Sequence, residues 1–448
     1  MKKTLLLTLA TGLVCATPLM ADVDIYLTGS TAFRSNVHDA CLKLFQSTPT
    51  KFYDTTGTIG GDGTSGNSNP VWTFTGTPTN SITALATAGQ LTIHADFTGS
   101  VQGMQAAQNG VKIWYLSSTG GVVSNTATIA FSDNSSTATP YPVDGTSYNE
   151  EQVAVQPFVF VKSNNQGAMT NINNITWEQV NYMIKAGRIP LASWTFRTND
   201  MTNFVYLINR TKDSGTRRTT YAYAGYGYNQ SQTTYNYDAT NNVFYKATNT
   251  LAASRGGVSN NIVSYGVVGA PGVGGANLGW GSGYVGGGDV RSAVGVVNSN
   301  NLSIGYLSFS DARTVVNTAG SNWTQVVSLN GVWPTAAGAG LYGHTGTNDF
   351  SPVTIGSYGN WGYEVVVYPL KDPSTLYADQ NMLQSQVGDQ NTAGTFLGVL
   401  DAVSAGAASP GSLDFEIETS KTGGNGATAI RLGNMLSSRA SVGGTVAP

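Results

Sequence analysis

The amino-acid sequence predicts an α/β protein, and three observations support this prediction. Short apolar runs of strand length alternate with amphipathic stretches of helix length through most of the chain. Two of these pairs repeat the order strand, glycine-containing turn, helix. The chain has 448 residues, of which 40% are apolar, so it can bury the cores of two domains of ordinary size.

The two repeats come early in the chain. Residues 25–27 predict a buried strand, and the helix expected at 34–45 places its apolar side chains on one face. Residues 91–97 predict a second strand, which a short turn joins to a helix at 101–108. The repeated unit is typical of a sheet covered by helices.

A polar segment separates the two repeats. Residues 55–80 are rich in Gly, Thr, Ser, Asn and Pro and have little periodicity, which predicts a mobile surface insertion. A further strand is expected at 126–131, and a new apolar run covers 153–161. Because a polar connector lies between them, we expect a boundary between two lobes near residue 150.

The second half of the chain contains the clearest helix. Thr176 and Gln179 have the spacing of a capping box, apolar side chains from Trp177 onward fall on one face, and Gly187 ends the helix. Residues 204–208 then predict a strand. Further elements are expected as helices at 289–297, 395–403 and 428–436, and as strands at 304–309 and 364–368.

Tyrosine, asparagine and glycine dominate residues 221–288, which predicts an elaborated loop or ribbon. Ordinary packing of a β-ribbon explains the tyrosines. Stacking on sugars or an adhesive surface is the functional alternative.

Composition limits the classes of function. The chain has 22 Lys plus Arg and 25 Asp plus Glu, so we expect no nucleic-acid partner, since a basic footprint is missing. His38, His94 and His344 lack metal-ligand spacing, and the glycines at 286–288 lack the strand and acid of a dinucleotide site. We therefore expect no metal, no cofactor, no catalytic residue and no enzyme.

The first residues predict export. Two lysines at positions 2 and 3 precede an apolar run too short to span a bilayer, which is typical of a signal peptide. We expect cleavage after Ala21, although Leu19 is large for its position, and lipid attachment at Cys15 is the alternative. Cys41 is then the single cysteine of the mature chain, so no intrachain disulfide can form.

Three turns offer groups that bind anions. Residues 29–33 and 99–100 precede predicted helices, and residues 214–216 follow Arg210. A tetrahedral anion is held best by backbone N–H groups at helix starts, with hydroxyls and an arginine in addition. Each turn alone is better explained as a helix cap without a ligand. Their combination favours an oxyanion site.

The order of these turns, with Ser132 and Asp133 after a strand, resembles the phosphate-binding proteins of bacterial ABC importers. The resemblance covers most of the mature chain in separate blocks and leaves out 55–80 and 221–280. It implies a two-lobed periplasmic binding protein type II fold with Gly/Tyr/Asn-rich insertions. The domains it implies are a signal peptide at 1–21, lobe 1 at 22–150, lobe 2 at 151–362, and a return to lobe 1 at 363–448.

The resemblance also implies roles for residues. Ser100 would donate from lobe 1, residues 214–216 from lobe 2, and Arg210 would supply a charged fork. Asp133 would accept a hydrogen bond from a protonated phosphate oxygen, which sulfate cannot offer. The ligand-binding residues it implies are Ser30, Thr31, Ala32, Phe33, Ser100, Asp133, Arg210, Ser214, Gly215 and Thr216.

Two positions depart from the family pattern. Ala32 stands where a second threonine is frequent, and Lys212 stands where an acid usually restrains the arginine. Either Asp213 takes over this restraint, or the site is more positive and its ligand differs. Phosphate is the expected ligand, with phosphonate, phosphorylated compounds and other oxyanions as alternatives.

We therefore expect a monomeric periplasmic or secreted protein that captures phosphate for ABC-type import, with an ABC permease as a possible partner. A secreted or surface structural or adhesive protein of the same fold is the alternative. Residual phosphatase activity is a third hypothesis.

Overall fold

A computed structural model describes residues 22–59, 61, 63–67, 69–163, 167–211, 213–227, 233, 235–238, 243–246, 283–284, 286–295, 302–316, 324–336, 349–389, 391–404, 430, 435–442 and 446–447. The expected signal peptide with Cys15, Lys212, His344 and most of the segment 221–288 lie outside the described residues. Among the described residues, no helix is long and apolar enough to cross a membrane.

A large mixed sheet organises the described part of the chain. Its main path has the order β10-β11-β14-β8-β16-β7-β1-β4-β3-β2, and β15 and β9 join it beside β8. The strands are β1 (Val23–Gly29), β2 (Thr50–Tyr53), β3 (Val71–Gly76), β4 (Leu91–Asp96), β7 (Ile129–Ser132), β8 (Tyr148–Ser163), β9 (Asn174–Ile175), β10 (Arg188–Pro190), β11 (Phe204–Ile208), β14 (Ser303–Ser308), β15 (Thr324–Leu329) and β16 (Trp361–Pro369).

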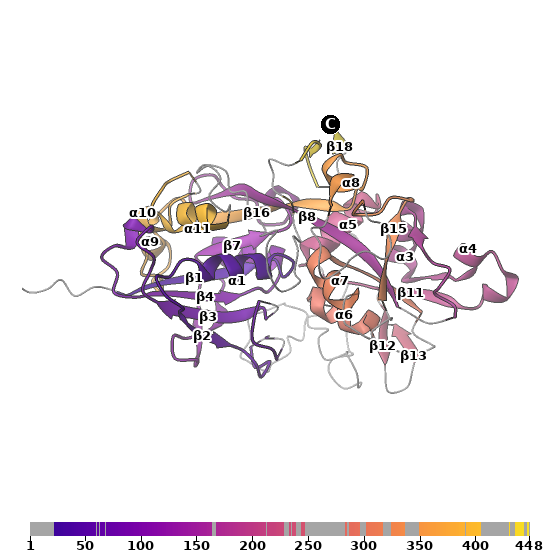
Figure 1. Cartoon of the computed structure of the whole chain (residues 1–448), viewed down its shortest axis with the longest axis horizontal. Helices are drawn as coiled ribbons and strands as arrows, with labels where there is room; N and C mark the ends of the chain where they lie inside the picture. Colours follow the sequence, from indigo (N-terminus) through magenta and orange to yellow (C-terminus); the bar gives the residue numbers. More distant parts are fainter. Residues whose placement is uncertain are drawn as a thin grey trace, which may run out of the picture.

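Two groups of elements lie side by side, with β8 and β16 running between them (Figure 1). We call the group around β1 lobe 1 and the group around β11 lobe 2. The helices of lobe 1 are α1 (Arg34–Leu42), α2 (Ser100–Asn109), α9 (Pro373–Leu376), α10 (Gln384–Val387) and α11 (Phe396–Ser404). Those of lobe 2 are α3 (Trp177–Ala186), α4 (Ala192–Thr195), α5 (Gly215–Tyr223), α6 (Gly287–Gly295), α7 (Phe309–Val316) and α8 (Ser351–Thr354).

Lobe 1 packs helices on both faces of its part of the sheet. β1 pairs in parallel with β4 on one side and with β7 on the other. One buried cluster joins these strands to α1 and α11, and a second cluster joins β1 and β7 to α2. Parallel strands buried on both faces explain the short and nearly continuous apolar runs of the sequence.

Lobe 2 has its own core. Side chains of β11, β14 and β15 form one buried cluster with those of α3, α6 and α7. The capping box of Thr176 and Gln179 begins α3, and Gly187 ends it with a φ of +76°. The sequence-based prediction of this helix is confirmed because its start and stop signals are local.

Two strands, β8 and β16, connect the lobes, and we call this connection the hinge. The first part of β8 pairs with β16, and its second part pairs with β14 and β15. Along β8 the buried side chains pass from a lobe 1 cluster at Ala154 to the lobe 2 cluster at Val155. Along β16 the same change falls between Trp361 and Val366. The two-lobed α/β fold is thus confirmed, while the exact boundaries at 150 and 362 stay a proposal.

Short hairpins lie outside the main sheet. They pair β5 (Ile113–Leu116) with β6 (Val122–Asn125), β12 (Tyr235–Asp238) with β13 (Val243–Lys246), and β17 (Ser438–Arg439) with β18 (Val446–Ala447). The β12–β13 pair is a described part of the ribbon expected in the tyrosine-rich segment.

Three expectations are wrong. Residues 71–76, assigned to a mobile insertion, form the buried strand β3 between β2 and β4, and threonines at alternate positions concealed its apolar pattern. Ile430, placed in a helix, instead forms a β-bridge with Val155 of β8, because β14 pairs with β8 only from Phe158 onward and leaves room for another segment beside Val155. Tyr221 belongs to α5 and to the core of lobe 2 rather than to a surface ribbon.

Candidate functional site

The strand ends of lobe 1 and the loop after β11 in lobe 2 meet where the lobes touch. Gly29 ends β1 with a φ of +125°, and a Cβ atom there would lie 1.9 Å from the carbonyl oxygen of Phe131. Only glycine permits this approach. It lets the Ser30 N–H donate to the same carbonyl oxygen at 2.8 Å and fixes the turn that follows β1.

Asp133 is the centre of the contact between the lobes. It follows β7 and is 1% exposed. One carboxylate oxygen accepts the Ser100 hydroxyl of lobe 1, and the other accepts the Thr216 hydroxyl of lobe 2 at 3.1 Å. Gly215 packs so closely that a Cβ atom there would lie 1.6 Å from Oδ1 of Asp133. The carboxylate therefore joins two chain segments more than 80 residues apart.

Helix starts face this carboxylate from both lobes. Ser100 is the first residue of α2, and Gly215 is the first residue of α5. The Ser214 hydroxyl caps α5 by accepting the N–H of Arg217 at 3.3 Å. Free N–H groups and the helix dipole make such starts favourable for negative charge. The Val101 N–H donates to the Asp213 carbonyl oxygen at 3.2 Å and holds the two helix starts together.

Arg210 crosses from lobe 2 to lobe 1. Its side chain is buried, and Nη2 donates to the Thr31 hydroxyl at 3.2 Å. Nε donates to the carbonyl oxygen of Tyr284 at 3.2 Å, and the backbone N–H donates to the Tyr306 hydroxyl at 3.1 Å. These bonds position the guanidinium at the junction of the lobes.

The ten predicted residues thus lie at the same junction but contribute differently. Ser100, Asp133, Arg210 and Thr216 make contacts between side chains there. Ser30 accepts the Ala32 N–H at 3.2 Å, which stabilises its own turn. The Phe33 side chain belongs to the core of lobe 1, so only its backbone is available to a ligand. Their role in ligand binding stays a prediction.

Two charged residues of this junction were missed by the sequence analysis. Arg34, the first residue of α1, forms a 3.0 Å ion pair with Asp311 in the first turn of α7. Arg34 also donates to the Thr31 carbonyl oxygen. No motif in the sequence joins two residues 277 positions apart, so only the fold reveals this pair.

Burial and charge act differently on the two aspartates. Burial raises the pKa of Asp133, and the Ser100 hydroxyl, Arg210 and the Thr216 hydroxyl oppose this shift. Burial also acts to raise the pKa of Asp311, but Arg34, Arg291 and Arg210 outweigh it and hold the value below the usual range. Its neighbours therefore hold Asp311 in the ionised form, whereas burial disfavours the ionised form of Asp133.

Glu364 is a third carboxyl group close to the site. It lies where β16 changes register, and Val365 beside it pairs with Ser132, the neighbour of Asp133. It is fully buried, and neither carboxylate oxygen has a hydrogen-bond partner in the described residues. Burial raises its pKa well above the usual range, and the charge of Asp133 adds to this.

Replacing Glu364 with glutamine is expected to reduce the pH dependence of stability. A carboxyl group whose pKa is higher in the folded state favours folding at low pH, and this contribution is lost as the pH rises through the folded pKa. Wild-type stability should fall more steeply than that of the variant as the pH rises above the usual pKa range of a glutamate. Thermal unfolding at a series of pH values above that range measures the difference, with Glu178→Gln, an exposed carboxyl, as control. Parallel wild-type and Glu364→Gln curves would contradict the prediction.

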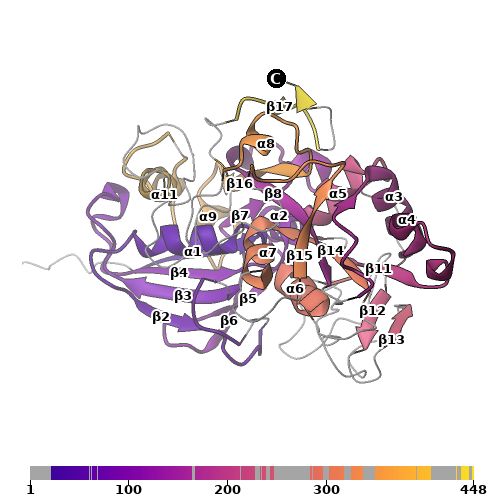
Figure 2. The same cartoon turned by 45° about the vertical axis from the view of Figure 1, so that its right-hand side comes forward.

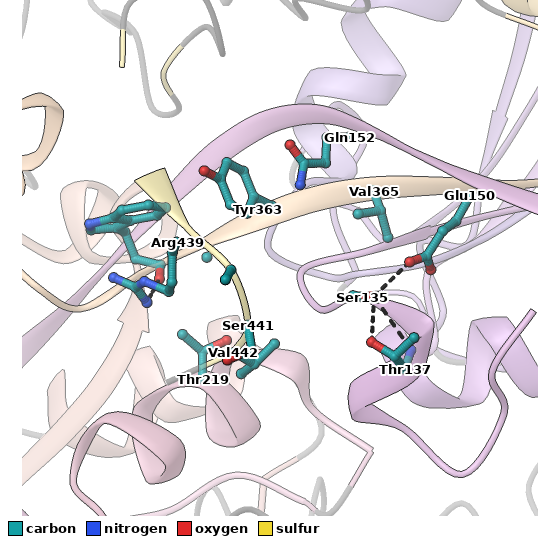
Figure 3. Close-up of a pocket in the computed structure, with 13 residues that line it drawn as sticks. Ser135, Thr137, Glu150, Gln152, Thr219, Tyr363, Val365, Arg439, Ser441 and Val442 are labelled. Atoms are coloured by element: carbon teal, nitrogen blue, oxygen red, sulfur yellow. Dashed lines mark hydrogen bonds between the residues drawn. The ribbon is translucent and has the colours of Figure 1, made fainter. Parts of the chain in front are cut away.

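A separate cavity of about 250 Å³ lies at the hinge (Figure 3). Its walls include Glu150 of β8, Tyr363 of β16 and Thr219 of α5. The C-terminal segment contributes Arg439, whose guanidinium lies 3.9 Å from the Trp361 ring centroid and donates to the carbonyl oxygens of Trp361 and Gly359 at 2.7 and 3.0 Å. The end of the chain is thereby attached to hinge strand β16.

Replacing Arg439 with alanine is expected to destabilise the fold by about 2–4 kcal/mol, because the buried Trp361 carbonyl and the partly buried Gly359 carbonyl lose their donor and the cation–π contact disappears. Chemical denaturation measures this change. Arg197→Ala, at an exposed position, is the matched control and should stay within about 0.5 kcal/mol of wild type. Equal losses in the two variants would show that Arg439 has no special role at the hinge.

The described histidines have structural partners. His38 contacts Asp39 and Tyr53, and His94 contacts Asp24 and the Leu116 carbonyl oxygen. Within the ranges that the structure describes, no group of three or more His, Cys, Asp or Glu side chains could hold a metal ion.

The fold and the junction define a two-lobed α/β protein with its candidate site between the lobes. No protein-family model matches the chain, and no curated protein matches it. Solved structures of similar architecture include a DING protein (TM-score 0.37, 12% identity, 92% of this chain and 98% of the other). Another is an ABC-type phosphate transport receptor from Vibrio cholerae (TM-score 0.35, 10% identity, 79% of this chain and 89% of the other). A third is a phosphate-binding protein from Stenotrophomonas maltophilia (TM-score 0.35, 10% identity, 79% of this chain and 80% of the other). Because these TM-scores lie below 0.5, the candidate binding site is inferred from the contacts of this chain alone.

Proposed function

We propose that this protein binds a tetrahedral oxyanion, with phosphate as the first choice, between its two lobes. The observation that carries the proposal is the meeting of Ser100 and Asp133 from lobe 1 with Arg210 and Thr216 from lobe 2. Two helix starts and a buried guanidinium in one place form a donor set that suits an oxyanion.

Asp133 supports phosphate over sulfate. A carboxylate among these donors repels an oxyanion unless a proton lies between the two groups. Phosphate carries such a proton near neutral pH, whereas sulfate does not. The proposed ligand is therefore a protonated oxyanion, which includes hydrogen phosphate, monoalkyl phosphates and phosphonates.

The proposed role is capture, without a chemical step, for delivery to a membrane permease from the periplasm or the outside of the cell. Closure of two lobes on a ligand produces a shape that a permease can distinguish from the open protein. The site residues serve here as donors and acceptors, and the proposal gives none of them a catalytic role.

Calorimetry with phosphate, sulfate, methylphosphonate and glucose tests the proposed function. Phosphate should bind and raise the melting temperature, because a ligand of the folded state stabilises it by mass action. Sulfate should bind at least about 10-fold more weakly, since it cannot donate to Asp133. Absence of binding by every oxyanion, together with glycan binding or self-assembly, would instead favour a surface structural or adhesive protein.

A further inference from the structure

We propose that Asp311 and Arg34 form a latch between the lobes, and that this latch positions the arginine of the site. The anion-binding part of the inference rests on the proposed function, whereas the latch itself does not. The two side chains come from different lobes, on α1 and α7, which lie beside one another across the junction in both views (Figure 1 and Figure 2).

The geometry of the pair is that of a buried ion pair. Arg34 Nη2 lies 3.0 Å from Asp311 Oδ1, and the two side chains are 9% and 3% exposed. A hydrogen bond also joins the lobes beside this contact: the Ser310 hydroxyl of lobe 2 donates to the Ala32 carbonyl oxygen of lobe 1 at 3.3 Å. Separation of the lobes would break both contacts.

Lobe 2 fixes the Asp311 carboxylate from two sides. The Ser308 hydroxyl at the end of β14 donates to Oδ2 at 3.1 Å. The first residue of α6, Gly287, packs so closely that a Cβ atom there would lie 1.9 Å from the same oxygen. The carboxylate thus lies at the start of a nine-residue helix, whose dipole favours its ionised form. Ser308 and α6, both in lobe 2, thus contact the carboxylate independently of Arg34.

A chain of contacts links the latch to the candidate site. Arg34 Nη1 donates to the carbonyl oxygen of Thr31, and the hydroxyl of the same threonine accepts Nη2 of Arg210 at 3.2 Å. The path from Asp311 through Arg34 and Thr31 to Arg210 crosses the lobe boundary twice. A shift of Arg34 would therefore move the turn against which Arg210 is oriented.

Asp311 also supplies negative charge near Arg210, where the expected acid is missing from the sequence. Lys212 stands at the position two residues after the arginine, where an acid is expected. Asp311 instead interacts electrostatically with Arg210, Arg34 and Arg291. One carboxylate from α7 thus attracts three arginines. It partly balances their charge and leaves the junction favourable for an added anion.

The latch should favour closure only modestly. Burying an ion pair removes water from both charges, so the pair contributes to closure only while its geometry is good. A bound anion would attract the same arginines and add to the attraction that the Asp311–Arg34 pair provides alone. We therefore expect the latch to raise the closed population before the ligand binds, and its loss to weaken binding indirectly.

The test compares wild type with Asp311→Asn, Arg34→Gln and the double variant. Small-angle X-ray scattering measures the radius of gyration in buffer and with saturating inorganic phosphate, and calorimetry measures phosphate affinity. Asp24→Asn is the control, because Asp24 pairs with His94 inside lobe 1 at 3.1 Å and spans no lobe boundary. Circular dichroism verifies that each variant is folded, and the two single variants alter different lobes, so one remains informative if the other fails to fold.

We expect each single variant to have a larger radius in buffer than wild type and the control. Saturating phosphate should restore the wild-type radius. A variant closed for about a tenth of the time would bind phosphate about 10-fold more weakly, and the double variant should be no weaker than the single variants.

Unchanged radii in buffer for both single variants would overturn the latch, whatever their affinity for phosphate. Additive losses in the double variant would overturn it as well, because partners in one interaction are coupled. If wild type binds no oxyanion, the proposed function fails, yet the comparison of radii in buffer still decides the latch.

Discussion

Replacing Arg210 with alanine is expected to weaken phosphate binding by about 100-fold or more. Hydrogen bonds to charged groups contribute about 1.5–3 kcal/mol each, and the guanidinium is the cation that reaches from lobe 2 to Thr31 in the site. The loss of about 2.7 kcal/mol corresponds to a factor of 100 in affinity. Isothermal titration calorimetry with phosphate measures the effect.

The control for this prediction is Arg188→Ala. Arg188 also belongs to lobe 2, but its guanidinium lies over the ring of Phe204, 4.1 Å from the centroid, at the outer edge of the sheet. This variant should bind phosphate as wild type does. Affinity that survives in a folded Arg210→Ala protein would remove the arginine from the proposed site.

Adding one methyl group at Gly215 is expected to abolish the site without unfolding either lobe. The Cβ atom of Gly215→Ala would lie 1.6 Å from Oδ1 and 2.6 Å from Cγ of Asp133. Since Asp133 is buried between Ser100 and Thr216, it can move aside only by leaving its two donors, or the lobes must separate. Either outcome should reduce phosphate affinity by at least about 100-fold, because hydrogen bonds from both lobes are lost together.

Gly295→Ala provides the matched control. Gly295 ends a helix of the same lobe, and a Cβ atom there would meet no atom within 4 Å among the described residues outside its own helix and its chain neighbours. Both variants should unfold in a similar temperature range, because position 215 lies between the lobes rather than within either core. Wild-type affinity in Gly215→Ala would show that the close approach of α5 to Asp133 is unnecessary for binding.

The hinge residues offer a way to separate binding from stability. Glu364 and Arg439 act on the strands that join the lobes, whereas Arg210 and Gly215 act where the lobes meet. Variants of the first pair should change unfolding with little direct loss of ligand contacts. Variants of the second pair should change affinity in a folded protein. A panel of both kinds therefore distinguishes damage to the fold from damage to the site.

Some features of this protein follow from the sequence alone. The helix α3 is determined by signals within about a dozen residues, since Thr176 and Gln179 cap its start and Gly187 ends it. Strand β11 coincides with the apolar run at 204–208. The α/β class follows in the same way, because the spacing of apolar residues reports the local period of the backbone.

Other features were decided only by the tertiary structure. The threonines of strand β3 suggest a polar surface insertion when only the sequence is considered. In the structure, neighbouring strands bury these threonines. Asp311 has no local signature as a partner of Arg34, and Glu364 is indistinguishable in sequence from a surface acid. A carboxyl group acquires its pKa and its partners from the elements packed around it. The sequence therefore predicts the turns that could hold an anion, while the fold alone decides which charges surround them.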